Sequence, residues 1–132
     1  DVIDYWHRHD VNLNESLWQI IRKLSQNPSI HLYIATNQTH ERADYLWNDL
    51  GFKTYFKDIY YSAKLGCFKN DPRYFRQIEE QLGIDPAEEP PLFFDDDKRN
   101  IKVSSERGWT AVYFDTTDDC LNHPLITPLL AA

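Results

Sequence analysis

Apolar residues along the chain form two kinds of pattern, and the two kinds alternate. Short apolar runs of strand length lie at residues 30–35, 59–61, 92–94 and 110–114. Segments with apolar residues at helical spacing lie before or between these runs. Strands that alternate with helices predict βαβ units, and therefore a parallel sheet flanked by helices. The predicted fold class is a three-layer, Rossmann-like α/β domain.

Four predicted helices have clear start and stop signals. Asparagine, threonine or aspartate caps the first three, and a glycine or a proline ends each of the four. With their caps the helices span residues 14–28, 39–51, 71–83 and 98–108. The segment from Asp115 onward carries no strong pattern and is predicted to be a tail.

Length, composition and charge limit the classes of function. The chain has 132 residues, of which 42% are hydrophobic and 27% charged, as expected for one globular domain. No apolar run is long enough to span a membrane and the first residues do not form a signal peptide, so we expect a cytoplasmic protein. The net charge of −7 disfavours nucleic acid or an anionic membrane as the main partner, because both require a basic surface. Cys67 and Cys120 lack the spacing of a metal or redox motif.

Candidate site residues lie at or after the C-terminal ends of predicted strands. Thr36 and Asn37 follow one strand, Lys69 lies on a later loop, and Asp95 and Asp96 follow another strand. Ligands of parallel α/β sheets bind at this edge, so we expect these residues to converge on one pocket. A hydroxyl, backbone amides at a helix start and an ammonium are suited to hold a phosphate group.

The acidic run at residues 95–97 is the strongest local signal for a metal. Three adjacent carboxylates repel one another unless a cation is present or one of them is protonated. Hard oxygen ligands of this kind suit Mg²⁺. Asn100 lies one helical turn beyond Asp96 and could orient a ligand or a metal-bound water. The alternative is an acidic first turn of a helix, stabilised by the helix dipole.

Two other groups of residues offer alternatives. Lys64 lies five residues before Lys69 and could take the same role. His7, His9 and Asp10 could contact a metal from an extended segment, although a surface loop is the simpler interpretation.

Three segments, in this order, resemble motifs of the haloacid dehalogenase-like (HAD) superfamily, in the branch whose cap is inserted after the first strand. YIATNQ is similar to its second motif, YYSAKLGCFKNDPRYF to its third and LFFDDDKRNIKVSSERGW to its fourth. Asn70 replaces a proline of the usual third motif. The resemblance covers about residues 10–114. It implies the end of a cap or linker at 1–13, a partial core domain at 14–114 and a tail at 115–132.

The resemblance also implies roles for the candidate residues. Thr36 and Asn37 would bind the phosphoryl group of the substrate, and Lys69 would stabilise that group and the covalent intermediate. Asp96, with Asp95 beside it, would hold Mg²⁺. The implied function is hydrolysis of a small phosphorylated metabolite through an aspartyl-phosphate.

The first motif of the family supplies a nucleophilic aspartate and a second aspartate as acid/base. Asp4 follows two apolar residues, but Trp6 stands where the second aspartate would be. The first-motif strand lies mid-sheet, between the strands that end at Thr36 and Asp95. We therefore expect a sheet that lacks its central first strand, in the C-terminal part of a longer protein whose cap lies mostly upstream. A bound N-terminal fragment or a neighbouring chain would supply the strand, and this chain alone would be inactive.

Two other functions are compatible with the same segments. One is a catalytically inactive HAD-like domain that binds a phosphorylated ligand or a protein partner. The other is a metal-independent dehalogenase, which the acidic run at 95–97 disfavours because its chemistry needs no Mg²⁺ ligands. A phospho-receiver domain is rejected, because its acidic pair comes first in the chain and here it follows Thr36 and Lys69.

Overall fold

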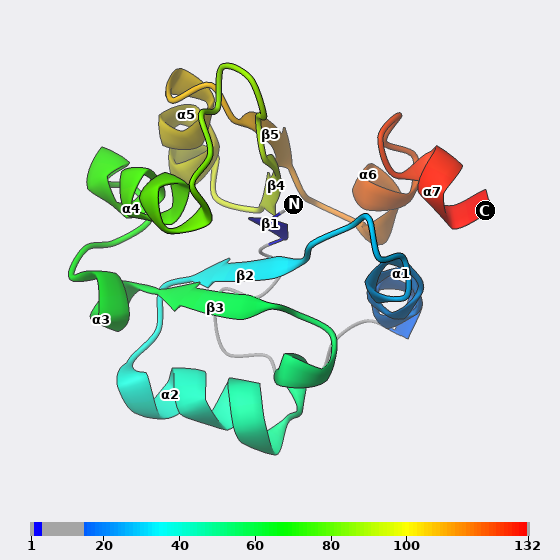
Figure 1. Ribbon diagram of the computed structural model, residues 1–132, viewed down its shortest axis with the longest axis horizontal. Helices are drawn as coiled ribbons and strands as arrows, with labels where there is room; N and C mark the ends of the chain where they lie inside the picture. Colours follow the sequence, from blue (N-terminus) through cyan, green and yellow to red (C-terminus); the bar gives the residue numbers. More distant parts are fainter. Residues whose placement is uncertain (1, 4–14, 132) are drawn as a thin grey trace.

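The computed structural model describes residues 2–3 and 15–131, which form a parallel sheet flanked by helices (Figure 1). The described strands lie in the order β3-β2-β1-β4-β5, and every pairing is parallel. They are β1 (Val2–Ile3), β2 (Tyr33–Thr36), β3 (Asp58–Tyr61), β4 (Leu92–Asp95) and β5 (Thr110–Tyr113). The predicted class, an α/β fold with parallel strands and flanking helices, is confirmed.

The short strand β1 lies in the centre of this sheet. Val2 pairs with Tyr33 of β2 and with Phe93 of β4, and Ile3 pairs with Phe94. The expectation that the sheet lacks its central strand is therefore wrong, because a strand of this same chain joins β2 to β4. Val2 and Ile3 therefore lie within the sheet and not in a linker before it. The sequence pattern missed β1 because two apolar residues are shorter than the roughly three to ten residues of an ordinary strand.

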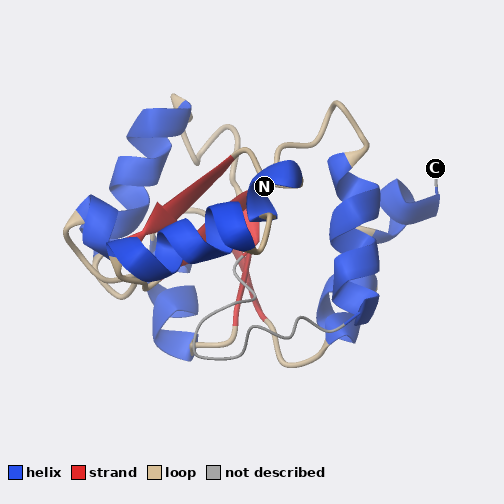
Figure 2. Cartoon of the chain, turned by 90° about the horizontal axis from the view of Figure 1, so that it is seen from below, coloured by secondary structure: helices blue, strands red, loops and turns tan. Residues whose placement is uncertain are grey.

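Helices cover both faces of the sheet, as Figure 2 shows from below. The helix α2 continues as a π-helical segment. The segment predicted as a tail contains two helices, α6 and α7. The helical elements are α1 (Glu15–Ser25), α2 (His40–Asp44), the π-helical segment (Tyr45–Asp49), a 3-10 turn (Phe52–Thr54), α3 (Ser62–Leu65), α4 (Pro72–Leu82), α5 (Lys98–Glu106), α6 (Thr117–Leu121) and α7 (Thr127–Ala131). Among the described helices, none is both long and apolar enough to cross a bilayer.

Successive strand residues contribute to two separate hydrophobic cores. Ile34 and Phe94 pack in the core that includes residues of α1, α2 and α6, whereas Ala35 and Phe93 pack in the core that includes residues of α4. This alternation follows from the strand geometry, in which neighbouring side chains point to opposite faces. Because β2 and β4 are buried on both faces, their C-terminal ends are where polar side chains can gather.

Candidate functional site

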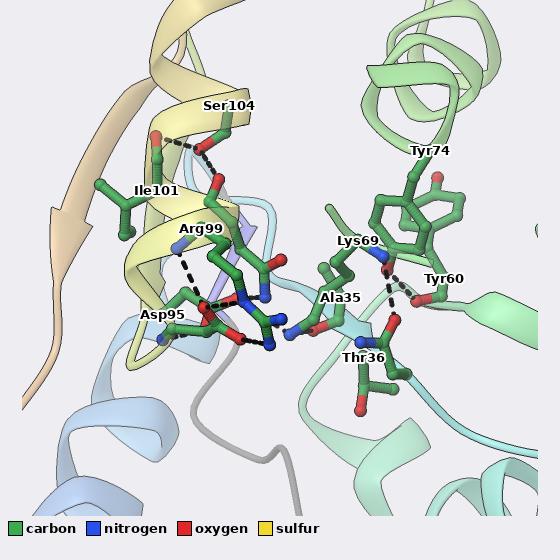
Figure 3. A network of polar contacts seen from close by, with 12 residues as sticks. Ala35, Thr36, Tyr60, Lys69, Tyr74, Asp95, Arg99, Ile101 and Ser104 are labelled. Atoms are coloured by element: carbon green, nitrogen blue, oxygen red, sulfur yellow. Dashed lines mark hydrogen bonds and ion pairs between the residues drawn. The ribbon is translucent and has the colours of Figure 1, made fainter. Parts of the chain in front are cut away.

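Lys69 and Asp95 form a buried ion pair at the C-terminal edge of the sheet (Figure 3). The Nζ atom of Lys69 lies 2.9 Å from Oδ2 of Asp95 and 3.3 Å from the carbonyl oxygen of Ala35. The two side chains are only 1% and 0% exposed. Desolvation lowers the pKa of the Lys69 ammonium, and the charge of Asp95 opposes this shift. The pair fixes the loop before α4 against the ends of β2 and β4.

Asp95 accepts hydrogen bonds on both of its carboxylate oxygens. The backbone N–H of Asp97 donates to Oδ1 at 2.8 Å, and the side-chain amide of Asn100 donates to Oδ2 at 3.0 Å. Asn100 is itself buried and therefore supports this carboxylate from within the protein. Together with Lys69, these donors make Asp95 a residue that holds the lysine in place.

Thr36 and Asn37 connect the end of β2 to the same site. Thr36 is fully buried, and the side-chain amide of Gln38 donates to its Oγ1 atom at 3.3 Å. The Oδ1 atom of Asn37 accepts a hydrogen bond from the backbone N–H of Lys69 at 3.0 Å. The structure therefore brings the residues predicted after β2 and before α4 together. Gln38 was not identified in the sequence; its position two residues after a strand end was the available signal.

Asp96 directly follows β4 and is half-buried. Its charge, like that of Asp95, opposes the lowering of the Lys69 pKa by burial. A carboxylate at this edge fits Mg²⁺, which usually takes one or two protein carboxylates and keeps several waters. In the part of the chain that the structure describes, no group of three or more His, Cys, Asp or Glu residues could hold a metal ion. A single half-buried carboxylate such as Asp96 is compatible with a Mg²⁺ ion that keeps several of its waters.

Asp97, the third member of the acidic run, has a structural contact instead. It is the N-cap of α5, and its Oδ1 atom accepts from the backbone N–H of Arg99 at 2.9 Å. The Arg99 guanidinium also pairs with Oδ2 at 2.8 Å, and these hydrogen bonds lower the pKa of Asp97. Asp97 therefore caps α5 and does not stand in an acidic first turn of that helix, as the alternative expected.

The alternative lysine lies outside the site. The Nζ atom of Lys64 is 3.8 Å from Oδ1 of Asp58 and 5.8 Å from the centroid of the Tyr60 ring, and its side chain is 40% exposed. Lys69 is consequently the lysine at the strand ends. Four other sequence candidates lie outside the described residues: Asp4, His7, His9 and Asp10.

Tyr74 of α4 supports the end of β3 through a buried hydrogen bond. Its side chain is fully buried, and its hydroxyl donates to the carbonyl oxygen of Tyr60 at 2.5 Å. Burial raises the pKa of Tyr74 well above its usual range, although a hydrogen bond from the backbone of Thr36 opposes this. The hydroxyl therefore stays protonated and remains a donor.

Tyr74→Phe is expected to lower the free energy of unfolding by about 0.5–1.5 kcal/mol, because the substitution removes one buried hydrogen bond at nearly constant volume. Urea denaturation of the purified chain measures this change. Tyr45→Phe, at a partly exposed position, is the matched control and should leave the stability unchanged. Equal stability of Tyr74→Phe and wild type would show that this hydroxyl contributes nothing.

Comparison with known proteins identifies similar sequences and folds. A family model described as a haloacid dehalogenase-like hydrolase matches residues 5–102. An uncharacterized protein from Corynebacterium glutamicum has a TM-score of 0.76 at 17% identity, and the match covers 98% of this chain and 93% of that one. A HAD-superfamily hydrolase from Ehrlichia chaffeensis has a TM-score of 0.72 at 20% identity, and the match covers 94% of this chain and 63% of that one. Among the curated proteins, none matches.

A third similar structure contains ligands. It is a HAD family enzyme from Bacteroides thetaiotaomicron in complex with magnesium and inorganic phosphate, with a TM-score of 0.61 at 24% identity. The match covers 74% of this chain and 52% of that enzyme. This chain thus spans about half the length of that enzyme. At these identities the structural matches show the shared fold alone.

Proposed function

Because this chain belongs to the haloacid dehalogenase-like hydrolase family, we propose that the full-length protein hydrolyses phosphate monoesters of small metabolites with the help of Mg²⁺. The observation that carries the proposal is the buried Lys69–Asp95 pair beside Thr36 at the C-terminal edge of the sheet. An ammonium held there by fixed partners is a preorganised site for a phosphoryl group. The Bacteroides enzyme, with its magnesium and phosphate, supports the choice of ligand.

In this proposal each residue of the chain has a distinct task. Lys69 neutralises charge on the phosphoryl group, and burial strengthens that attraction because the surroundings are poorly solvated. Thr36 binds a phosphoryl oxygen through its hydroxyl. Asn37 fixes the backbone of Lys69, and Asp95 fixes its ammonium. Positioning of this kind stabilises the charge that develops during phosphoryl transfer without reorganisation at the moment of reaction.

Asp96 is the residue that we assign to Mg²⁺. Asp95, expected as a second ligand, bonds through both oxygens to groups of the protein, so we assign it the positioning of Lys69. When bound, the ion would neutralise charge on the phosphoryl oxygens.

Asp96→Asn in the full-length protein is expected to lower kcat/KM for a phosphate monoester by on the order of 10²-fold, because it removes a charged metal ligand. Asp97→Asn is the matched control. It should have a much smaller effect, since asparagine is also a good N-cap for α5. Steady-state kinetics over a range of Mg²⁺ concentrations makes the comparison. Equal losses in the two variants would contradict the assignment of Asp96.

The covalent route also requires a nucleophilic carboxylate, and neither Thr36 nor Lys69 is one. Asp4, which follows β1 in the sequence and lies outside the described residues, is the first residue to test. In this proposal a residue outside these 132 supplies the acid/base that Trp6 replaces, so the 132-residue chain alone is expected to be inactive. Hydrolysis of 4-nitrophenyl phosphate by the purified chain with Mg²⁺ tests this. Turnover that disappears in Asp4→Asn would contradict the expected inactivity and would identify the nucleophile.

A catalytically inactive domain that binds a phosphorylated ligand is the second candidate function. The observation that favours it is Trp6 at the place of the acid/base aspartate. Such a domain would bind phosphate with Lys69 and Thr36 but would show no turnover in the full-length protein. Measurement of binding and of turnover on the same full-length sample separates the two functions.

A further inference from the structure

A cavity of about 730 Å³ opens beside the proposed phosphoryl site. The residues along it include Asn37, Gln38, Ser62, Cys67, Phe68 and Arg73. It adjoins the site through Asn37, which lines the cavity and accepts a hydrogen bond from the backbone N–H of Lys69. Its volume lies within the range of roughly 300–1,000 Å³ that is typical of sites for small organic ligands. An ester bound through its phosphoryl group would have this cavity available for the rest of the molecule.

Phe68 is the most conspicuous side chain along the cavity. It is 65% exposed, more than any other large hydrophobic side chain in the described parts of the chain. An aromatic ring in water can bury its face by stacking against another flat ring. An exposed aromatic next to a cavity is therefore suited to bind a ring system.

The charges along the cavity compensate one another. The Nη2 atom of Arg73 lies 2.7 Å from Oδ2 of Asp71, and its Nε atom donates to the same carboxylate. Hydrogen bonds from Arg73 lower the pKa of Asp71, so that carboxyl stays ionised at neutral pH. The remaining residues found along the cavity carry amides, hydroxyls, a thiol or apolar groups. The cavity therefore favours an uncharged occupant with hydrogen-bonding groups.

Gln38 links the cavity to the proposed phosphoryl site. Its backbone N–H donates to Oγ of Ser62 at 3.0 Å, and the Ser62 hydroxyl lies 3.3 Å from its carbonyl oxygen. These contacts fix the backbone, while its side-chain amide reaches Oγ1 of Thr36. One residue thus lines the cavity and contacts the hydroxyl assigned to the phosphoryl group.

We propose that this cavity binds the leaving-group half of the substrate, and that the substrate is the phosphate monoester of an uncharged compound with a flat, hydrogen-bonding ring, such as a nucleoside. The ring stacks on Phe68, and Gln38 forms hydrogen bonds with the polar groups of the ring. This inference rests on the proposed phosphoryl site, because the ester must be anchored there for its ring to enter the cavity.

Titration calorimetry of the 132-residue chain with Mg²⁺ tests the proposal with three probes: inorganic phosphate, glycerol 1-phosphate and uridine 5′-monophosphate. In the wild type, the nucleotide should bind about tenfold more tightly than glycerol phosphate, as expected for one stacked ring. Phe68→Ala should remove this advantage and leave the Kd of inorganic phosphate unchanged. Tyr45→Ala, another exposed aromatic that is not found along the cavity, is the control and should change none of the three.

The outcomes separate this inference from the proposed function. The part of the cavity beside Phe68 that is proposed to bind the ring is the ring subsite. If inorganic phosphate binds but the nucleotide does not bind more tightly than glycerol phosphate, the ring subsite is overturned and the phosphoryl site stands. If Phe68→Ala weakens all three probes equally, the ring subsite is also overturned. If none of the probes binds, both the phosphoryl site and the ring subsite are overturned.

Discussion

Asp95→Asn is expected to lower the free energy of unfolding by about 3–5 kcal/mol, because it leaves the buried ammonium of Lys69 without its counter-charge. Asp97→Asn makes the same chemical change two residues away. There the partner, Arg99, is 76% exposed and asparagine preserves the helix cap, so the stability should change little. Urea denaturation of both variants, with circular dichroism as the probe, measures the difference.

A double variant tests whether Lys69 and Asp95 stabilise the protein as a pair. Lys69→Met removes the charge that Asp95→Asn leaves unpaired, so Lys69→Met/Asp95→Asn should be more stable than Asp95→Asn alone. If the losses of unfolding free energy in the two single variants simply add in the double variant, the result would contradict a buried ion pair. The same result would also remove the basis for treating Asp95 as the residue that holds Lys69.

Lys69→Met in the full-length protein is expected to reduce kcat/KM for phosphate-monoester hydrolysis by on the order of 10²–10³-fold, because it removes the cation assigned to the transferred phosphoryl group. Lys64→Met is the matched control five residues earlier. Lys64 is exposed and lies near Asp58, so its loss should leave activity unchanged. Circular dichroism at the assay temperature confirms that each variant is folded. Undiminished activity of folded Lys69→Met would overturn the role of this lysine.

Most of the sheet was predictable because its strands are short apolar runs bounded by capping residues. The runs at 59–61, 92–94 and 110–114 differ from β3, β4 and β5 by only one residue at an end. The strand β1 was not predictable, because two apolar residues carry no periodicity and their pairing on both sides is decided by tertiary structure. The π-helical segment after α2 was missed for a related reason, since its apolar residues keep the spacing of an ordinary helix.

The convergence of Thr36, Lys69 and Asp95 could be predicted because parallel strands end at one edge of the sheet. The contacts that fix them could not. The Lys69–Asp95 pair joins residues 26 positions apart, and no local pattern shows that both side chains are buried. The support from Tyr74 likewise depends on tertiary packing, which brings its hydroxyl in α4 to the carbonyl oxygen of Tyr60 in β3. Sequence position therefore predicted that these residues lie close together, and packing determined how each is held.

The central claim is that Lys69 and Thr36 form a phosphoryl site next to a Mg²⁺ ligand, Asp96. A crystal structure of this chain grown with Mg²⁺ and inorganic phosphate tests it most directly. We predict phosphate within hydrogen-bond distance of Nζ of Lys69 and Oγ1 of Thr36, with Mg²⁺ on the Asp96 carboxylate. Phosphate bound away from these two residues, or Mg²⁺ bound without Asp96, would contradict the claim.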